Sequence, residues 1–268
     1  MSINIAFFKA YFKSMRLYYS FVTGITGWLG ISYYQFIADE NYYNPLSEFV
    51  QTVQEPTAPV KKLVILFILF LAWGINQIIN DYLGLKEDRV NAPDRPMVTG
   101  ELHPNTALAF SIFLLFISFA ITWFYLEPVA LIPFVAGIFL NILYEYAKGY
   151  GIWGNIVFGI MIAMCGLFGC WAAGPTETYF TRSTVSALVF IMITNGLMTY
   201  YTYFKDAKGD EIAGKKTIVV KYGLEKNRYI AIFASLLPSI LFLIGYFGFQ
   251  AFQIELNNIF IILGLLTI

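Results

Sequence analysis

Oxygen-bearing side chains recur at helical spacing in one stretch of the chain. Asn76, Asn80, Gly84 and Asp88 are each four residues apart, and four residues advance a helix by about 400°. We therefore expect these positions to form one stripe along a single helix, with Asp81 beside it. Carboxylate and amide oxygens are the ligands that hard divalent cations prefer. The stretch thus predicts one half of a cation site.

A second acidic stretch lies far along the chain, where Asp206 and Asp210 also share a helix face. Packed against Asn80 and Asp88, these carboxylates would complete an oxygen-rich site. Mg²⁺ is the expected occupant, because it keeps several waters and is commonly held by a few carboxylates together with substrate phosphates. We predict Asn80, Asp88, Asp206 and Asp210 as its ligands. The alternative is two solvated loops in which acids and bases merely pair with one another.

Basic side chains are interleaved with both acidic stretches. They are Arg89 and Arg95 near the first stretch, and Lys205, Lys208 and Lys215 in or just after the second. Phosphate oxygens form short, strong hydrogen bonds with such cationic donors. A diphosphate held jointly by Mg²⁺ and these bases is therefore the predicted ligand.

The composition requires a membrane around the helices that carry these residues. Hydrophobic residues make up 58% of the chain and charged residues 13%, against roughly 45–50% and 25% in soluble domains. So much apolar surface excludes a water-soluble enzyme and makes membrane lipids the expected surroundings. The 17 basic and 17 acidic residues balance, which leaves no net field to attract polyanions. A nucleic-acid partner is therefore not expected.

Seven segments are long and apolar enough for membrane helices, which need about 20 residues each. They are Leu17–Phe36, Leu63–Ile79, Ala107–Leu126, Val129–Leu143, Ile152–Ala173, Val185–Tyr203 and Tyr229–Phe249. An eighth begins near Ala251, and we expect at least one further helix beyond Ile268. The predicted fold is an all-α, polytopic membrane helix bundle that forms a single domain over residues 1–268.

The charge of the connecting loops predicts the orientation of this bundle. Alternate threading places fourteen of the seventeen basic residues on the side of the N-terminus, and only Lys61, Lys62 and Arg182 on the other. Cytoplasmic loops of membrane proteins carry the excess of Lys and Arg. The N-terminus and both acidic stretches are therefore predicted to face the cytoplasm.

These residues resemble the motifs of the UbiA superfamily of intramembrane prenyltransferases. The first motif of that family reads approximately N-D-x-x-D-x-x-x-D and is followed by N-x-P-x-R-P; the second reads D-x-x-D-x-x-G-D and is followed by A-G-x-x-T. The matching positions are Asn80, Asp81, Gly84, Asp88, Asn91, Pro93, Arg95 and Pro96, then Tyr203, Asp206, Gly209, Asp210, Ala213, Gly214 and Thr217. Between them, Asn141, Tyr144, Lys148, Gly154 and Asn155 resemble a polar joint between spans four and five. The resemblance covers nearly the whole chain and implies a nine-helix arrangement whose last helix is missing here.

Two positions depart from the family pattern. Gly84 and Tyr203 stand where the motifs usually have an aspartate. The loss of two carboxylates implies weaker metal affinity or one fewer metal ion. The sequence Glu87-Asp88-Arg89 after Gly84 also resembles the branch of the superfamily that cyclises prenyl diphosphates.

The resemblance implies Mg²⁺-dependent ionisation of a polyprenyl diphosphate and transfer of its prenyl group to a lipophilic or aromatic acceptor inside the membrane. Tyr144 and Tyr203 would face the allylic cation, and Asp81 or Glu145 would accept a proton. The implied catalytic residues are Asn80, Asp81, Asp88, Asp206, Asp210, Tyr144 and Tyr203, and the implied diphosphate ligands are Lys148, Arg95, Lys205, Asn76 and Arg16. The alternatives are a terpene synthase that cyclises the chain without an acceptor and a non-catalytic scaffold or transporter.

Overall fold

The computed structural model describes residues 4–42, 57–175, 180 and 182–244, with only the backbone described for 35–42 and 182–183. The described chain consists mainly of helices, with two strands of two residues each and short connecting turns. The first half contains α1 (Ile5–Met15), η1 (Leu17–Tyr19), α2 (Phe21–Tyr42), α3 (Pro59–Leu83), α4 (Leu85–Asn91), α5 (Pro96–Thr99) and α6 (Pro104–Tyr125). The second half contains η2 (Pro128–Ala130), α7 (Leu131–Ala147), β1 (Tyr150–Gly151), α8 (Trp153–Ala172), α9 (Arg182–Ile212), β2 (Lys216–Thr217), α10 (Ile218–Tyr222), α11 (Leu224–Ser235) and α12 (Leu237–Leu243).

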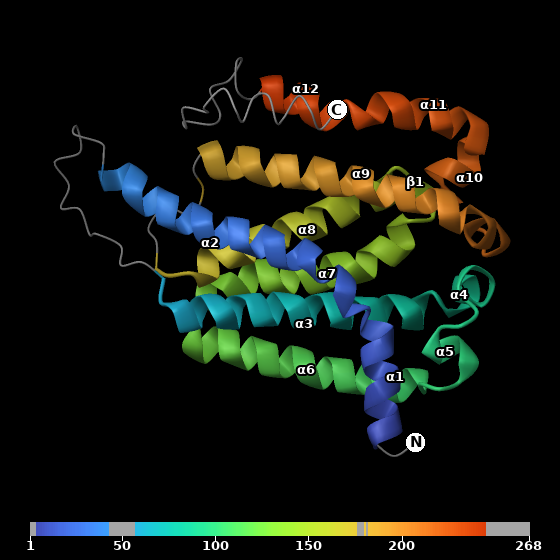
Figure 1. Cartoon of the computed structure of the whole chain (residues 1–268), viewed down its shortest axis with the longest axis horizontal. Helices are drawn as coiled ribbons and strands as arrows, with labels where there is room; N and C mark the ends of the chain where they lie inside the picture. The colour runs from blue at the N-terminus through green and yellow to red at the C-terminus, as the bar shows by residue number, and fades with distance from the viewer. Residues whose placement is uncertain (1–3, 43–56, 176–179, 181, 245–268) are drawn as a thin grey trace.

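The long helices lie side by side in a bundle, with α1 projecting from one side (Figure 1). Of the apolar stretch of α8, 78% is buried, against 22% for that of α6, so α8 forms the centre of the bundle. Glycines let α2 approach α8 closely: a Cβ added to Gly30 would lie 2.0 Å from the carbonyl oxygen of Gly166. Small residues at such contacts are typical of helix packing in membranes, where close backbone approach maximises van der Waals contact.

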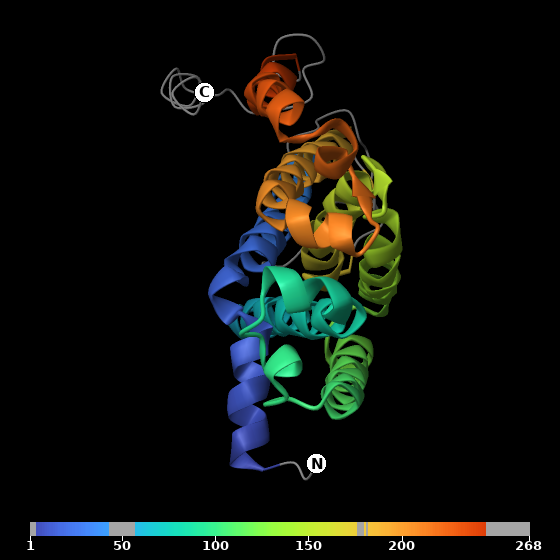
Figure 2. The ribbon, with the colours of Figure 1, turned by 90° about the vertical axis from the view of Figure 1, so that its right-hand side faces the viewer.

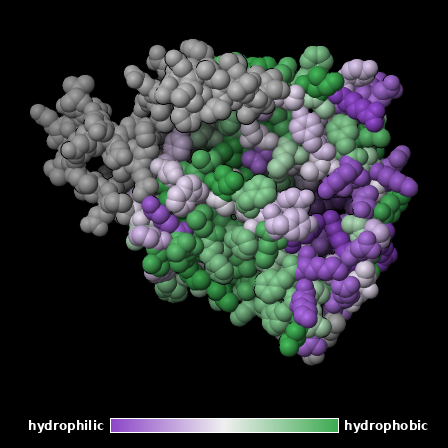
Figure 3. Space-filling view, viewed as in Figure 1, coloured by the Kyte–Doolittle hydropathy of each residue, from purple (hydrophilic) through white to green (hydrophobic). Residues whose placement is uncertain are grey.

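Five of the described helices are long and apolar enough to cross a membrane: Pro59–Leu83, Pro104–Tyr125, Pro128–Ala147, Trp153–Ala172 and Thr184–Ile212. They correspond to the second to sixth predicted spans, and they confirm an all-α integral membrane bundle. Hydrophobic residues cover much of the face in Figure 3, and hydrophilic residues gather at its right-hand end, where Figure 1 places α4, α5 and α10. The polar chemistry is therefore concentrated at one end of the bundle.

The structure corrects two sequence-based expectations about helix continuity. Predicted span Tyr229–Phe249 is interrupted, because α11 ends at Ser235 and α12 begins at Leu237. Its remainder, from residue 245, and the predicted eighth segment from Ala251 lie outside the described residues.

The expected stripe from Asn76 to Asp88 on one helix is also wrong, because α3 ends at Leu83 and α4 begins at Leu85. Gly84 forms the joint, with φ −95° and ψ 17°, and its N–H donates to the carbonyl oxygen of Asn80 at 2.8 Å. A Cβ at position 84 would lie 2.9 Å from that same oxygen, closer than ordinary van der Waals contact. The joint therefore favours glycine.

Candidate active site

The polar end of the bundle joins segments that are far apart in the sequence. The ends of α3, α7 and α9 meet α4, α5 and the short parallel pairing of β1 with β2 there, and Figure 2 views the molecule from this end. Tyr150 pairs with Lys216, and Gly151 with Thr217. The Thr217 hydroxyl accepts the Val220 N–H at 3.3 Å and so caps α10. These contacts fix the backbone around two clusters of charged side chains.

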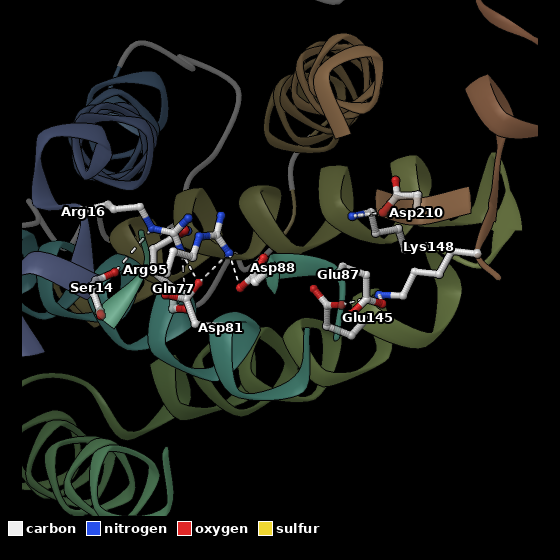
Figure 4. Close-up of polar contacts among 11 residues, drawn as sticks. Ser14, Arg16, Gln77, Asp81, Glu87, Asp88, Arg95, Glu145, Lys148 and Asp210 are labelled. Atoms are coloured by element: carbon white, nitrogen blue, oxygen red, sulfur yellow. Dashed lines mark hydrogen bonds and ion pairs between the residues drawn. The ribbon is translucent and has the colours of Figure 1, made fainter. Parts of the chain in front are cut away.

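The first cluster, called here the arginine cluster, consists of Arg16, Asp81, Asp88 and Arg95 (Figure 4). One oxygen of Asp81 lies 2.5 Å from Arg16 Nη2 and 2.9 Å from Arg95 Nη1. Arg95 also forms an ion pair with Asp88. The side chain of Asp81 is only 1% exposed, so the cluster is a buried network that links the end of α3 to α4, α5 and the segment after α1.

Burial and charge oppose each other in this cluster. Burial disfavours the charged form of Arg95, but the carboxylates of Asp81 and Asp88 outweigh it and raise the pKa of the guanidinium. For Asp88, burial is the larger effect and raises the carboxyl pKa, although Arg95 opposes that rise. A charged Asp88 therefore depends on the cations around it.

The second cluster, called here the lysine cluster, consists of Glu87, Glu145, Lys148, Asp210 and Lys215. Lys215 Nζ lies 2.8 Å from Glu87 Oε1 and 2.8 Å from Glu145 Oε2. Lys148 Nζ lies 2.9 Å from Asp210 Oδ1. Burial opposes the ammonium of Lys215, yet the carboxylates of Glu145 and Glu87 raise its pKa. Burial alone would raise the pKa of Glu87, but the hydrogen bond from Lys215 lowers it. The Glu87–Lys215 pair is therefore charged.

A clamp made by Asn91 joins the two acidic stretches. Its Nδ2 donates to the backbone oxygen of Asp206 at 3.1 Å, and its Oδ1 accepts the N–H of Gly209 at 3.0 Å. A Cβ added to Gly209 would lie 2.3 Å from the Asn91 side chain, so glycine is needed for this approach. The stretch after α3 and the end of α9 thus meet directly, as expected from their chemistry.

The oxygen donors of this end fit Mg²⁺ as a partner of a phosphate ligand. Among the described residues, no three acidic, His or Cys side chains gather into a ready-made metal site. Instead, buried oxygens without a hydrogen-bond partner include Asn80 Oδ1 and Asp210 Oδ2. Mg²⁺ commonly takes one or two protein carboxylates and completes its shell with waters and substrate phosphates. A few such donors are therefore sufficient.

The structure brings most of the predicted site residues to this end. Asp206 is partly buried, with its backbone held by Asn91. Tyr203 is fully buried, and Lys148 Nζ lies 5.6 Å from the centre of its ring. Tyr144 is buried and packs against Phe158, with their ring centres 5.4 Å apart.

Two predicted diphosphate ligands are placed differently. Lys205 is exposed, and within the described part of the chain no ion pair or hydrogen bond joins its side chain to either cluster. Asn76 lines a partly open cavity of about 80 Å³ together with Asn141. The remaining lining is mostly apolar and includes Leu69, Phe134 and Phe168. Asn76 and Asn141 each bring a buried oxygen without a hydrogen-bond partner to the cavity.

Lys215 was expected among the bases that balance a diphosphate, but its pairing with Glu87 was not predicted. Glu87 lies off the helical stripe, so periodicity gives no signal for it. Lys215 follows Gly214, whose φ is +78°, and the turn that aims this lysine into the bundle depends on that backbone conformation. A glycine directly before a lysine was the only local hint.

Comparisons with known proteins agree with this architecture. The model of the UbiA prenyltransferase family matches residues 49–267. The digeranylgeranylglyceryl phosphate synthase of Sulfolobus acidocaldarius is 31% identical over 203 residues, which cover 70% of this chain and 70% of that protein. The synthase of the same name from Sulfurisphaera tokodaii is 24% identical over 249 residues, 90% of this chain and 80% of that protein.

Solved structures share the fold. A structure described as a digeranylgeranylglyceryl phosphate synthase in membranes has a TM-score of 0.65 and 24% identity, covering 97% of this chain and 84% of its own. A UbiA homologue from Archaeoglobus fulgidus bound to GPP and Mg²⁺ has a TM-score of 0.66 and 15% identity, covering 96% of this chain and 83% of its own. Identities this low show the common helical architecture.

Proposed function

The chain belongs to the UbiA prenyltransferase family, and from that premise we propose that it transfers the prenyl group of a polyprenyl diphosphate to the hydroxyl group of a glycerophosphate-type lipid. We also propose that residues 1–268 form one membrane domain whose polar end faces the cytoplasm. The observation that carries the proposal is the Asn91 clamp, which joins the two acidic stretches. Because of it, carboxylates and cations from both stretches surround one region.

Asn80, Asp88, Asp206 and Asp210 are the residues proposed to hold Mg²⁺. Support comes from the unpartnered oxygens of Asn80 and Asp210, and from the family member that was solved with GPP and Mg²⁺. When bound, Mg²⁺ would neutralise charge on the departing diphosphate. Asn80 offers a neutral oxygen, so the ligand set carries less negative charge than four carboxylates would.

The cationic side chains are proposed to bind the diphosphate. Arg95 and Arg16 lie on one side, and Lys148 and Lys215 on the other, so fixed positive charge meets the negative charge that develops as the allylic C–O bond breaks. Lys205 is exposed and would join them only at the rim of the site. Asp81 holds both arginines through one oxygen. We therefore assign it the role of positioning Arg16 and Arg95, and not that of accepting a proton.

The apolar cavity is proposed to receive the first part of the prenyl tail. Tyr144 and Tyr203 lie at the polar end of α7 and α9, and aromatic faces attract a nearby cation. We assign these two rings to the allylic cation. Asn76 then lines the tail cavity and takes no direct part in binding the diphosphate.

The acceptor assignment follows the curated relatives. Their name describes a glyceryl phosphate that carries two geranylgeranyl groups, so the acceptor here would be a glyceryl phosphate with one prenyl group and one free hydroxyl. The hydroxyl oxygen would bond to the allylic carbon, the diphosphate would leave, and the hydroxyl proton would pass to a nearby carboxylate, for which Glu145 is our candidate. The relatives favour this transfer over the cyclase alternative, which uses no acceptor.

The test is a product assay with purified protein in lipid nanodiscs. Radiolabelled geranylgeranyl diphosphate and Mg²⁺ are supplied with and without geranylgeranylglyceryl phosphate. We expect a labelled ether lipid only when the acceptor is present, and none after EDTA removes the metal. Release of labelled hydrocarbon or terpene alcohol without acceptor would support cyclisation and overturn the proposal.

A further inference from the structure

A lysine ammonium lies next to the position where the first motif usually supplies a carboxylate. That position is Gly84, and a Cβ added there would lie 3.8 Å from Glu87 Oε2 and 4.0 Å from Glu145 Oε2. A carboxylate carried by position 84 would therefore compete for the space of these two side chains. Both are bound to Lys215 Nζ at 2.8 Å, a normal distance for an ammonium–carboxylate hydrogen bond.

The joint at Gly84 explains how Glu87 reaches this place. Glu87 and Asp88 are consecutive on α4 and so point about 100° apart, which lets them serve different clusters: Asp88 pairs with Arg95, and Glu87 lies beside Glu145 (Figure 4). Both acids are buried, 7% and 8% exposed. Gly84 therefore lacks the carboxylate that is usual at its position in the motif, and it also forms the joint before the helix that carries Glu87.

The backbone around Lys215 is fixed. Its N–H donates to the carbonyl oxygen of Asp210 at 2.8 Å, and the next N–H, of Lys216, donates to Gly149 at 3.3 Å. Its side chain is 17% exposed, and those of Glu87 and Glu145 are 11% and 12% exposed. The Lys215 ammonium is thus a buried cation between two carboxylates, an environment that would also suit a metal ion.

The formal charges of the polar end are consistent with one divalent ion. The two clusters together with Asp206 contain six carboxylates and four cationic side chains, which leaves a charge of −2. One Mg²⁺ would neutralise it. Without the Lys215 ammonium, the same groups would carry a formal charge of −3, more than one divalent ion neutralises.

We propose that Lys215, held by Glu87 and Glu145, is a resident cation that takes the place of a second metal ion, so that this site binds a single divalent ion. The inference rests on the proposed Mg²⁺ site and specifies its stoichiometry. It also predicts a latent site: removal of the ammonium leaves Glu87 and Glu145 free to bind a divalent ion of their own.

The test counts bound Mn²⁺ by electron paramagnetic resonance, with the purified full-length chain in detergent and inorganic pyrophosphate present. We expect one tightly bound Mn²⁺ per wild-type chain, two for Lys215→Gln, and one again for Lys215→Gln combined with Glu87→Gln. Lys216→Gln, which changes the exposed neighbouring lysine, is the matched control and should bind one.

The single variant Glu87→Gln gives an independent measurement that leaves Lys215 in place. If Glu87 only holds the ammonium, this variant should bind one Mn²⁺ with an affinity within threefold of wild type. A loss of tenfold or more would mean that Glu87 is itself a ligand of the first ion, and would overturn the inference even if Lys215→Gln does not fold. Two ions in the wild type would overturn it as well, leaving the proposed function intact, whereas no bound ion would contradict the proposed metal site itself.

Discussion

The arginine cluster and the lysine cluster lie next to each other at the polar end (Figure 4) but are built differently. In the arginine cluster, two planar guanidinium groups share one oxygen of Asp81, and guanidinium stays charged under all working conditions. In the lysine cluster, compact ammonium groups on flexible stems hold Asp210, Glu87 and Glu145. Both clusters carry proposed ligand-binding residues, but the first is also a rigid frame, whereas the second presents its charges on more flexible side chains.

The largest effect should come from breaking the lysine cluster at a proposed metal ligand. Asp210→Asn removes a buried carboxylate that pairs with Lys148, and we expect the rate of prenyl transfer to fall by about 10³-fold, the size of effect seen when one preorganised electrostatic group is lost. The assay is the initial rate at saturating Mg²⁺. Glu211→Gln, which changes the exposed neighbouring acid, should retain the rate within twofold. A rate above one tenth of wild type for Asp210→Asn would contradict the assignment.

Breaking the arginine cluster should affect stability first. Arg95→Met leaves Asp88 without its ion pair and Asp81 with only one arginine. Removing one partner of a buried pair costs about 3–5 kcal/mol, and we expect a loss of that size in the free energy of unfolding, measured by denaturant titration in micelles. Arg89 is exposed, so Arg89→Met should change the free energy of unfolding by less than about 0.5 kcal/mol. Equal effects of the two variants would show that the cluster does not act as a frame.

The clamp that holds the two clusters together should have an intermediate effect. Gly209→Ala places a Cβ 2.3 Å from the Asn91 side chain, and crowding of this kind costs about 1–3 kcal/mol. We expect a matching loss of stability together with weaker pyrophosphate binding by calorimetry. Gly24→Ala, where a Cβ meets nothing within 4 Å, should be neutral or slightly stabilising. Normal pyrophosphate affinity in Gly209→Ala would show that the Asn91 clamp is not needed to bind the diphosphate.

Breaking an exposed ion pair should cause the smallest loss of unfolding free energy, and this loss is the reference against which the buried clusters are compared. Lys13 and Glu101 are joined at 3.2 Å, but their side chains are 55% and 51% exposed. Pairs of this kind contribute about 0.2–1 kcal/mol because water screens them. Lys13→Gln should therefore lower the unfolding free energy by less than about 1 kcal/mol and leave the transfer rate unchanged. A larger loss would mean that burial is not what distinguishes the clusters.

Helix positions and the meeting of the two acidic stretches could be predicted from the sequence, because both depend on regular spacing. Long apolar runs identify membrane helices, and the paired positions of Asp206 and Asp210 put both acids on one helix face. The chemistry of the residues then favoured a meeting of the two stretches over two separate solvated loops, and the Asn91 clamp shows that they meet.

The partners of each charge could not be predicted, because they depend on backbone bends and tertiary distances. A helical repeat carried Asn76 to Asp88 straight through Gly84, whereas α3 ends at Leu83 and α4 begins at Leu85. In the same way, the position of Lys215 beside the second acidic stretch predicts a diphosphate-binding base but not its partner Glu87, which it reaches through the turn at Gly214. Sequence spacing gives a residue's face on a helix but not the direction of the next helix.

A double-mutant cycle on Mn²⁺ affinity in the presence of pyrophosphate tests whether the two acidic stretches share one ion. Asp88→Asn and Asp210→Asn are measured singly and together in the full-length protein. If both carboxylates hold one cation, either change weakens the same site, and the combined loss should fall short of the sum by at least about 1 kcal/mol. Losses that add within about 0.5 kcal/mol, as for independent positions, would show that the two acidic stretches do not share an ion and would contradict the central claim.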